Sequence, residues 1–246
     1  MPETSTHSLV RSLIAACIAT VAVAVTASAD TITFVPTEAR GNAFPFGYVG
    51  YFDEYQQVYR AGAFPSAITL RSATFTASPE FVSQPGIATT VTSSLSLGLS
   101  TTDAGPTSLR SRFHDNRGPN FVRVFTGVVT GVGAEPFSFR IAFDTPFVYR
   151  PSAGNLLLDV FINGNVTPDA RPFAFAFGPS PDMGRVFHEF GSGESFAGVN
   201  EGLLTRFEGT APVPEPGTLL LFATGGAAIV RRAWKGKALS QDARVH

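Results

Sequence analysis

Apolar and polar side chains alternate at every second position along much of the chain between residues 30 and 212, which predicts short β-strands. Strands are expected at 31–35, 54–59, 67–75, 91–100, 121–129, 137–143, 155–162, 173–177, 185–190 and 203–207. The pattern of 67–75 slips phase once, as a β-bulge would cause. The segment 155–162 is almost continuously apolar, which is typical of a central strand covered on both faces.

Composition agrees with an all-β domain, because Phe 23, Gly 24 and Pro 18 combine strand-forming aromatic residues with turn formers. No helix-period segment of convincing length lies between the two ends of the chain. We therefore predict an antiparallel two-sheet sandwich, jelly-roll-like in its connections. The net charge of -1, without blocks of like charge, argues against nucleic-acid binding.

A longer apolar run, Leu13 to Val25, marks the N-terminal end as a signal helix. Ala27 and Ala29 flank Ser28 in the small-x-small pattern of signal peptidase sites, so cleavage is expected before Asp30. An uncleaved anchor is the alternative. A lipoprotein signal at Cys17 is disfavoured because too little apolar sequence precedes the cysteine.

The C-terminal end combines a proline-flanked acid, an uncharged apolar run and a basic stop. Pro214 and Pro216 keep the backbone around Glu215 extended and outside any sheet or helix. The apolar run from 219 to 230 covers about 20 Å as a helix, short of the roughly 30 Å of a bilayer core. A transmembrane helix is expected here, in preference to a buried C-terminal helix, with membrane contacts from Leu219, Leu220, Leu221, Phe222, Ile229 and Val230 and a basic stop at Arg231 and Arg232.

The segment from Val213 to Arg232 resembles the PEP-CTERM sorting signal of Gram-negative bacteria, whose family is also labelled the ice-binding protein C-terminal domain. The resemblance implies that exosortase, a membrane-embedded processing enzyme, recognises Val213, Pro214, Glu215 and Pro216. It also implies export, transient anchoring in the inner membrane, then a cell-surface or extracellular location in a biofilm or exopolysaccharide setting. The stretches Tyr55 to Tyr59 and Ala153 to Val160 resemble, more loosely, stretches in other cargo of this kind with no assigned role.

These features divide the chain into a signal peptide at 1–29, a secreted domain at 30–212, the sorting signal with its helix at 213–232 and a basic cytoplasmic tail at 233–246. Signal peptidase and exosortase are the expected processing partners. Removal of the signal would leave a domain without cysteine, and so without disulfides or a thiol nucleophile.

Candidate catalytic and metal residues are few, and we expect a protein that is not an enzyme and has no cofactor. The loop around His114, Asp115 and Asn116 offers oxygen ligands for calcium, but flanking arginines oppose a cation and favour a solvated loop. His188 and Glu189 are neighbours in a predicted strand and so point to opposite faces. A hydrolase remains a third alternative, with carboxylates drawn from Asp159, Glu189, Glu194 and Glu201.

A carbohydrate-binding module is the main alternative to a purely structural surface protein. Aromatic residues gather in a glycine-rich segment before the second predicted strand, where Tyr48 and Tyr51 are the candidate sugar contacts and Tyr55 and Tyr59 lie close in sequence. Exposed aromatic side chains of this kind present an apolar face together with a polar tip. The competing interpretation is that these residues pack over the open end of the sandwich.

Overall fold

Thirteen strands and three short 3-10 helices form the described part of the computed structural model, which comprises residues 29–42, 45–46, 52–76, 78, 90–132, 138–165, 175–189, 195–198 and 200–212. The strands are β1 (Ala29–Phe34), β2 (Arg40–Asn42), β3 (Phe52–Tyr59), β4 (Ile68–Thr76), β5 (Thr90–Thr102), β6 (Val122–Val132), β7 (Ser138–Tyr149), β8 (Asn155–Asn165), β9 (Phe175–Pro179), β10 (Met183–Glu189), β11 (Ser195–Gly198), β12 (Glu201–Leu203) and β13 (Thr205–Thr210). The helical turns are η1 (Ala61–Ala63), η2 (Phe113–Asn116) and η3 (Pro151–Ala153).

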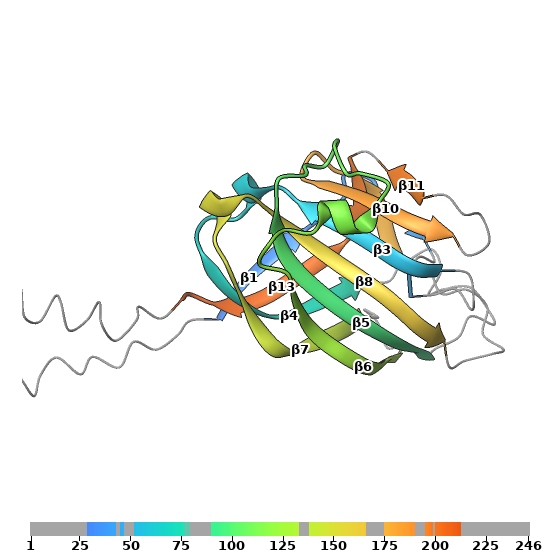
Figure 1. The fold of residues 1–246 in the computed structure, drawn as a ribbon. Coiled ribbons are helices and arrows are strands. Elements are labelled where there is room, and N and C mark those ends of the chain that lie inside the picture. Colours follow the sequence, from blue (N-terminus) through green and yellow to red (C-terminus); the bar gives the residue numbers. More distant parts are fainter. Residues whose placement is uncertain are drawn as a thin grey trace, which may run out of the picture.

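The strands form three antiparallel sheets (Figure 1). Their orders are β1-β13-β4-β7 in a four-stranded sheet, β11-β10-β3-β8-β5-β6 in a six-stranded sheet and β12-β9-β2 in a three-stranded sheet. In Figure 1, β5 and β8 lie in front of β1 and β13, and one hydrophobic core contains side chains from both of the larger sheets. The all-β prediction is confirmed, whereas the small third sheet was not expected.

The predicted alternation is visible in the burial of individual strands. In β7, Phe139 and Ile141 are buried while Ser138 and Arg140 are exposed. The central position predicted for 155–162 is also confirmed, because β8 lies between β3 and β5. The phase slip of 67–75 corresponds to a register shift between Leu70 and Ser72, where β4 pairs with β7.

An aromatic cluster joins the two larger sheets. The ring of Tyr59, on β3, lies 4.6 Å from that of Phe34 on β1 and 4.9 Å from that of Phe207 on β13, measured between centroids. Phe64 extends the cluster to Tyr149 at 4.6 Å. Aromatic pairs at these separations and tilted or edge-on angles stabilise a core beyond the area that they bury.

Gln57 provides the polar link between the sheets. Its side-chain carbonyl accepts the backbone N–H of Leu203 at 2.8 Å, and its amide donates to the carbonyl of the same residue at 3.1 Å. Thr205 accepts a hydrogen bond from the Tyr59 hydroxyl at 2.9 Å. A methyl group on Gly202 would lie 2.9 Å from the amide carbon of Gln57, so a glycine is needed for this close approach. The turn from β12 into β13 is thereby fixed against β3.

Three weak strands were missed by the sequence prediction, namely β2, β11 and β12. Each is very short, and its stability comes from its neighbours rather than from its own pattern: β2 and β12 pair with β9, and β11 pairs with β10. No helix of the described residues is long and apolar enough to span a membrane. The predicted signal helix and C-terminal helix lie outside the described residues.

The buried tyrosines predict how the fold responds to alkaline pH. Burial raises the pKa of the Tyr55, Tyr59 and Tyr149 hydroxyls above the ordinary value of about 10. A raised pKa in the folded state favours the neutral form, so this contribution to stability is complete below pH about 10 and is lost as the pH rises toward the folded values. We expect the three tyrosinates to form together with unfolding in a titration that follows tyrosinate absorbance and circular dichroism. Ionisation of all three with native circular dichroism retained would contradict this expectation.

Candidate functional site

Two predicted processing residues fall on the first strand. Ala29 and Asp30 open β1, where Ala29 lies opposite Thr210 and Asp30 opposite Gly209 of β13. Ala27, the sorting motif Val213, Pro214, Glu215 and Pro216, the anchor residues and the basic stop all lie outside the described residues. The start of β1 and the end of β13 are therefore side by side, at one end of the four-stranded sheet (Figure 1).

The connection from the domain to the sorting motif is short. β13 ends at Thr210, and only Ala211 and Pro212 separate it from Val213. At no more than about 3.6 Å per residue, Val213 can lie at most about 11 Å from the end of the strand. An enzyme that binds the motif must therefore act directly beside the folded domain.

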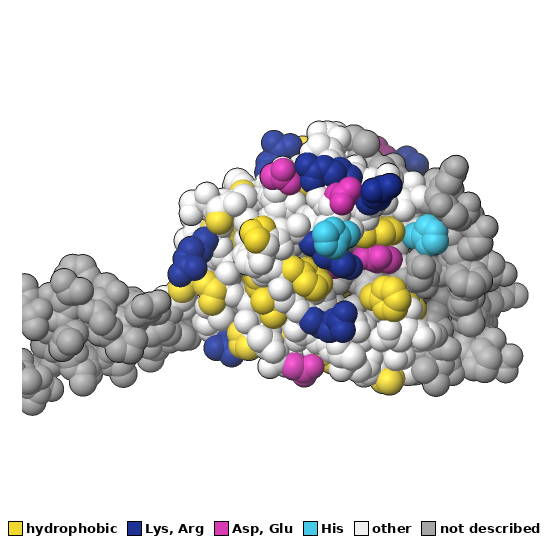
Figure 2. All heavy atoms as spheres, in the orientation of Figure 1, with side chains coloured by type: hydrophobic (Ala, Val, Ile, Leu, Met, Phe, Trp, Pro, Cys, Tyr) yellow, Lys and Arg dark blue, Asp and Glu magenta, His cyan; other side chains and the backbone are white. Residues whose placement is uncertain are grey.

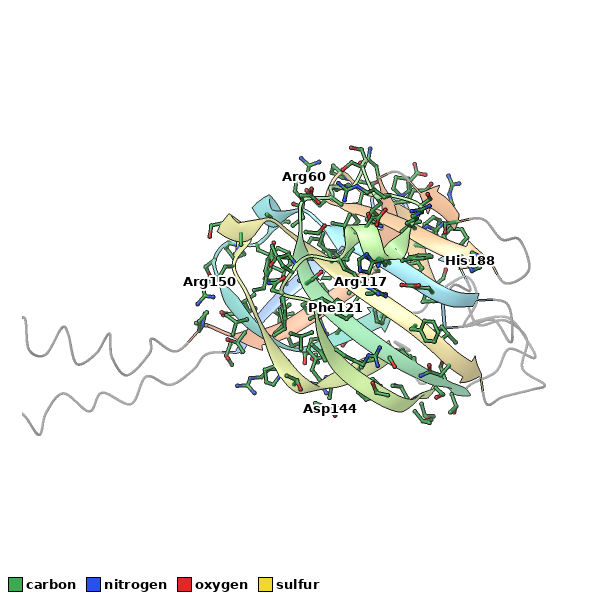
Figure 3. All side chains as sticks on the ribbon, viewed as in Figure 1. Arg60, Arg117, Phe121, Asp144, Arg150 and His188 are labelled. Carbon is green, nitrogen blue, oxygen red and sulfur yellow. The ribbon has the colours of Figure 1, made fainter. Side chains whose placement is uncertain are left out.

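A cluster of charged side chains lies on the outer face of the six-stranded sheet, which faces away from the core. The connection between β5 and β6 folds over this face and carries Arg117, labelled in Figure 3. The Arg117 Nε donates to the Asp159 carboxylate at 2.5 Å, and its Nη2 donates to Glu54 at 2.7 Å. One guanidinium thus joins carboxylates from β8 and β3.

Both carboxylates stabilise the charge of Arg117. Burial acts to lower the pKa of Arg117, but its hydrogen bonds and charge interactions with Asp159 and Glu54 outweigh that effect and hold the pKa above the ordinary value. Asp159 is only 3% exposed, and its carboxylate is paired with Arg117 and accepts a hydrogen bond from the Gln56 amide at 3.0 Å.

The sequence prediction of a solvated loop around His114 was right for His114 and wrong for Asn116. The His114 side chain is exposed, whereas Asn116 is buried and donates to the side-chain carbonyl of Gln56 at 2.9 Å. The only sequence signal for this inward packing is the charge of Asp159 within an otherwise apolar strand, which calls for a buried partner. Nothing in the sequence names Arg117 as that partner.

Two phenylalanines complete the outer face. The ring of Phe121 covers Gly98 of β5 so closely that a methyl group there would lie 2.4 Å from the ring, and Arg117 lies 5.0 Å from the centroid of the same ring. Phe161 of β8 is 43% exposed. In Figure 2 the hydrophobic side chains of this face are interspersed with charged and polar ones.

The described aromatic residues in and near the predicted sugar-binding segment lie inside the domain. Tyr55 and Tyr59 are fully buried, and Phe46 packs between Phe75 and Phe139 at centroid distances of 4.7 and 5.0 Å. These residues are core residues, as the packing interpretation held. Tyr48 and Tyr51 lie outside the described residues.

Of the carboxylates considered for hydrolysis, Asp159 and Glu201 lie on opposite sides of the six-stranded sheet. Asp159 pairs with Arg117 on the outer face, while Glu201 lies 3.6 Å from Arg185, which stands opposite Gln57 on the inner face. Glu194 lies outside the described residues, and of Glu189 only the backbone, at the end of β10, is described. In the described ranges, no group of three or more His, Cys, Asp or Glu side chains is placed to hold a metal ion.

Arg185 itself is a buried charge with an unusual set of contacts. Its guanidinium carbon lies 3.8 Å from the ring centroid of Phe177 and 5.0 Å from that of Phe187. Its Nε and Nη1 atoms are buried without a hydrogen-bond partner, and burial lowers its pKa. Contacts with these two rings and the ion pair with Glu201 together offset part of the cost of burying this cation.

Comparison with known families identifies a sorting motif at the C-terminal end. The model of the PEP-CTERM protein-sorting motif matches residues 212–235. The chain thus carries a PEP-CTERM protein-sorting motif. No curated protein matches the chain at a significant level.

The match begins where the described fold ends, because β13 stops at Thr210 and the family match starts at Pro212. The PEP-CTERM motif marks the chain as a substrate of exosortase, sorted to the surface or exterior of the cell. Residues 29–211 lie outside this match, so the role of the β-domain has to be argued from its own residues.

The Arg117 cluster makes a testable prediction about stability. Arg117→Ala leaves the buried Asp159 carboxylate without its cation, and we expect the free energy of unfolding to fall by about 3 kcal/mol. Adding Asp159→Asn should recover part of this loss, because the uncompensated charge is removed. The control is Arg140→Ala, which breaks a half-exposed pair with Glu208 and should cost below about 1 kcal/mol. Equal costs for the two single variants in urea denaturation would contradict the assignment.

Proposed function

We propose that this chain is a non-enzymatic surface or matrix protein of a biofilm or exopolysaccharide setting. Its body is a two-layer sandwich of the jelly-roll kind, exported by the signal peptide 1–29 and held in the inner membrane by the helix within 213–232. Signal peptidase cuts before Asp30. Exosortase then cuts near Pro214 to Pro216 and releases or transfers the domain to the cell surface.

The observation that carries the proposal is the junction between the fold and the sorting motif. β1 and β13 are antiparallel neighbours, and Ala29 and Thr210 form their terminal pair. Both export segments consequently join the domain at the same end, so the domain can stand on the membrane with its other surfaces free. Only Ala211 and Pro212 then lie between the sheet and the motif that exosortase recognises.

The ion pairs formed by two of the candidate carboxylates support the proposal of a non-enzymatic role. Asp159 is buried under Arg117, and Glu201 is paired with Arg185 on the other side of the sheet. General acid and base groups for glycoside hydrolysis must instead converge on one bond from a shared cleft. A carbohydrate-binding module is the second candidate function, and the exposed Phe161 on a sheet face favours it.

Replacement of one acid in the motif tests the sorting step. Glu215→Ala removes the only charge between the two prolines, and we expect uncut protein to accumulate in the membrane fraction of the native host. Glu38→Ala is the matched control, because Glu38 is an exposed glutamate of the domain and should leave processing unchanged. Immunoblots of membrane and extracellular fractions provide the readout. Processing of the Glu215→Ala chain to the wild-type extent would refute the recognition role.

A further inference from the structure

Four side chains form a continuous row across the outer face of the six-stranded sheet. Glu54 of β3 lies opposite Phe161 of β8, which in turn lies opposite Ser96 of β5, and Ser96 lies opposite Thr126 of β6. We call this set the Phe161 row. Because neighbouring strands are about 4.8 Å apart, the row spans about 14 Å.

The position of Phe161 within this row is unusual for a structural residue. Leu157 and Asp159, at the preceding alternate positions of β8, are buried, yet Phe161 is 43% exposed on a strand flanked by paired strands on both sides. It is flanked by the short side chain of Ser96, so the ring stands open above the sheet. An exposed aromatic ring in an inner strand, surrounded by polar groups, is a surface on which an apolar face can stack.

Hydrogen-bonding groups surround the ring. The Ser96 hydroxyl accepts from Thr126 at 3.3 Å and from the Asn163 amide at 3.4 Å. On the opposite side, Glu54 is held by Arg117, which is itself fixed by Asp159 and by the ring of Phe121. The carboxylate of Glu54 is therefore a pre-positioned acceptor, and its orientation does not have to be fixed when a ligand binds.

The charges of this face favour a neutral ligand. Glu54 and Asp159 are matched by Arg117 and by Arg123, which is exposed opposite Gly98 on the same face. The two carboxylates and two guanidinium groups cancel, so the face has no net field to attract a polyanion.

We propose that the Phe161 row binds a neutral polysaccharide, laid across β3, β8, β5 and β6 with one sugar ring stacked on Phe161. The hydroxyl groups of the sugar chain bond to Glu54, Asn163 and Thr126. The proposal rests on the proposed exported location, because only an exported domain meets extracellular polysaccharide. It differs from the binding predicted at Tyr48 and Tyr51, which lie in another part of the sequence.

Affinity electrophoresis of the full chain tests the proposal, with a detergent that carries no sugar headgroup. Gels contain galactomannan, polygalacturonate, or the neutral or acidic fraction of the host's own extracellular polysaccharide. We expect retardation by the neutral host fraction and not by polygalacturonate. Phe161→Ala should raise the dissociation constant about tenfold or more, since a central aromatic anchor carries much of such binding energy. Phe161→Trp should retain binding because it keeps a stacking surface.

Matched variants separate the outcomes. Val148→Ala removes an equally exposed apolar side chain, 43% exposed, from β7 of the other large sheet and should bind as the parent does. Circular dichroism of each variant verifies that the fold is retained. Absence of binding to every neutral gel overturns the proposal, as does loss of binding in Tyr48→Ala or Tyr51→Ala with Phe161→Ala unaffected. Self-association of the parent that Phe161→Ala abolishes, without glycan binding, would instead assign the row to a second copy of the chain. None of these results depends on exosortase processing, which the Glu215→Ala experiment tests separately.

Discussion

The packing of β13 against β3 is the interaction on which the rest of the domain depends. β13 lies between β1 and β4 within its own sheet, and across the core its Phe207 ring meets Tyr59 while Thr205 accepts the Tyr59 hydroxyl. Gln57 binds the backbone of Leu203 through both its carbonyl and its amide. Loss of these contacts would leave several buried polar groups unsatisfied at once, each at a cost of about 1–3 kcal/mol. The last strand of the domain, β13, thus completes the core between the two larger sheets.

This arrangement couples folding to the sorting tail. The PEP-CTERM motif follows β13 after two residues, so a chain that presents the motif to exosortase has already supplied every strand of the domain. The same strand pairs with β1, whose first residues are the predicted signal peptidase site. The first and last strands of the domain therefore end side by side, while Arg117 and Phe121 lie on the outer face of the six-stranded sheet (Figure 3).

Local patterning predicted most of the strands because side-chain periodicity is a property of consecutive residues. The alternation of β7, the continuous apolar run of β8 and the bulge of β4 were all readable in this way. The sorting motif was readable for a similar reason, since its prolines, acid and apolar run are contiguous. The Arg117–Asp159 pair was not, because its members are 42 residues apart and meet only when a loop folds over the sheet. The exposure of Phe161 was equally hidden, because the sequence places it within a run that is otherwise buried.

The central claim is that the chain is cut at the start of β1 and just after β13, the paired first and last strands of the domain. Mass spectrometry of both termini of the mature protein from the native host tests this claim most directly. The account predicts a first residue of Asp30 and a last residue upstream of Leu219, with the complete β1–β13 pair retained apart from Ala29. A mature protein that keeps both Met1 and His246 would contradict it.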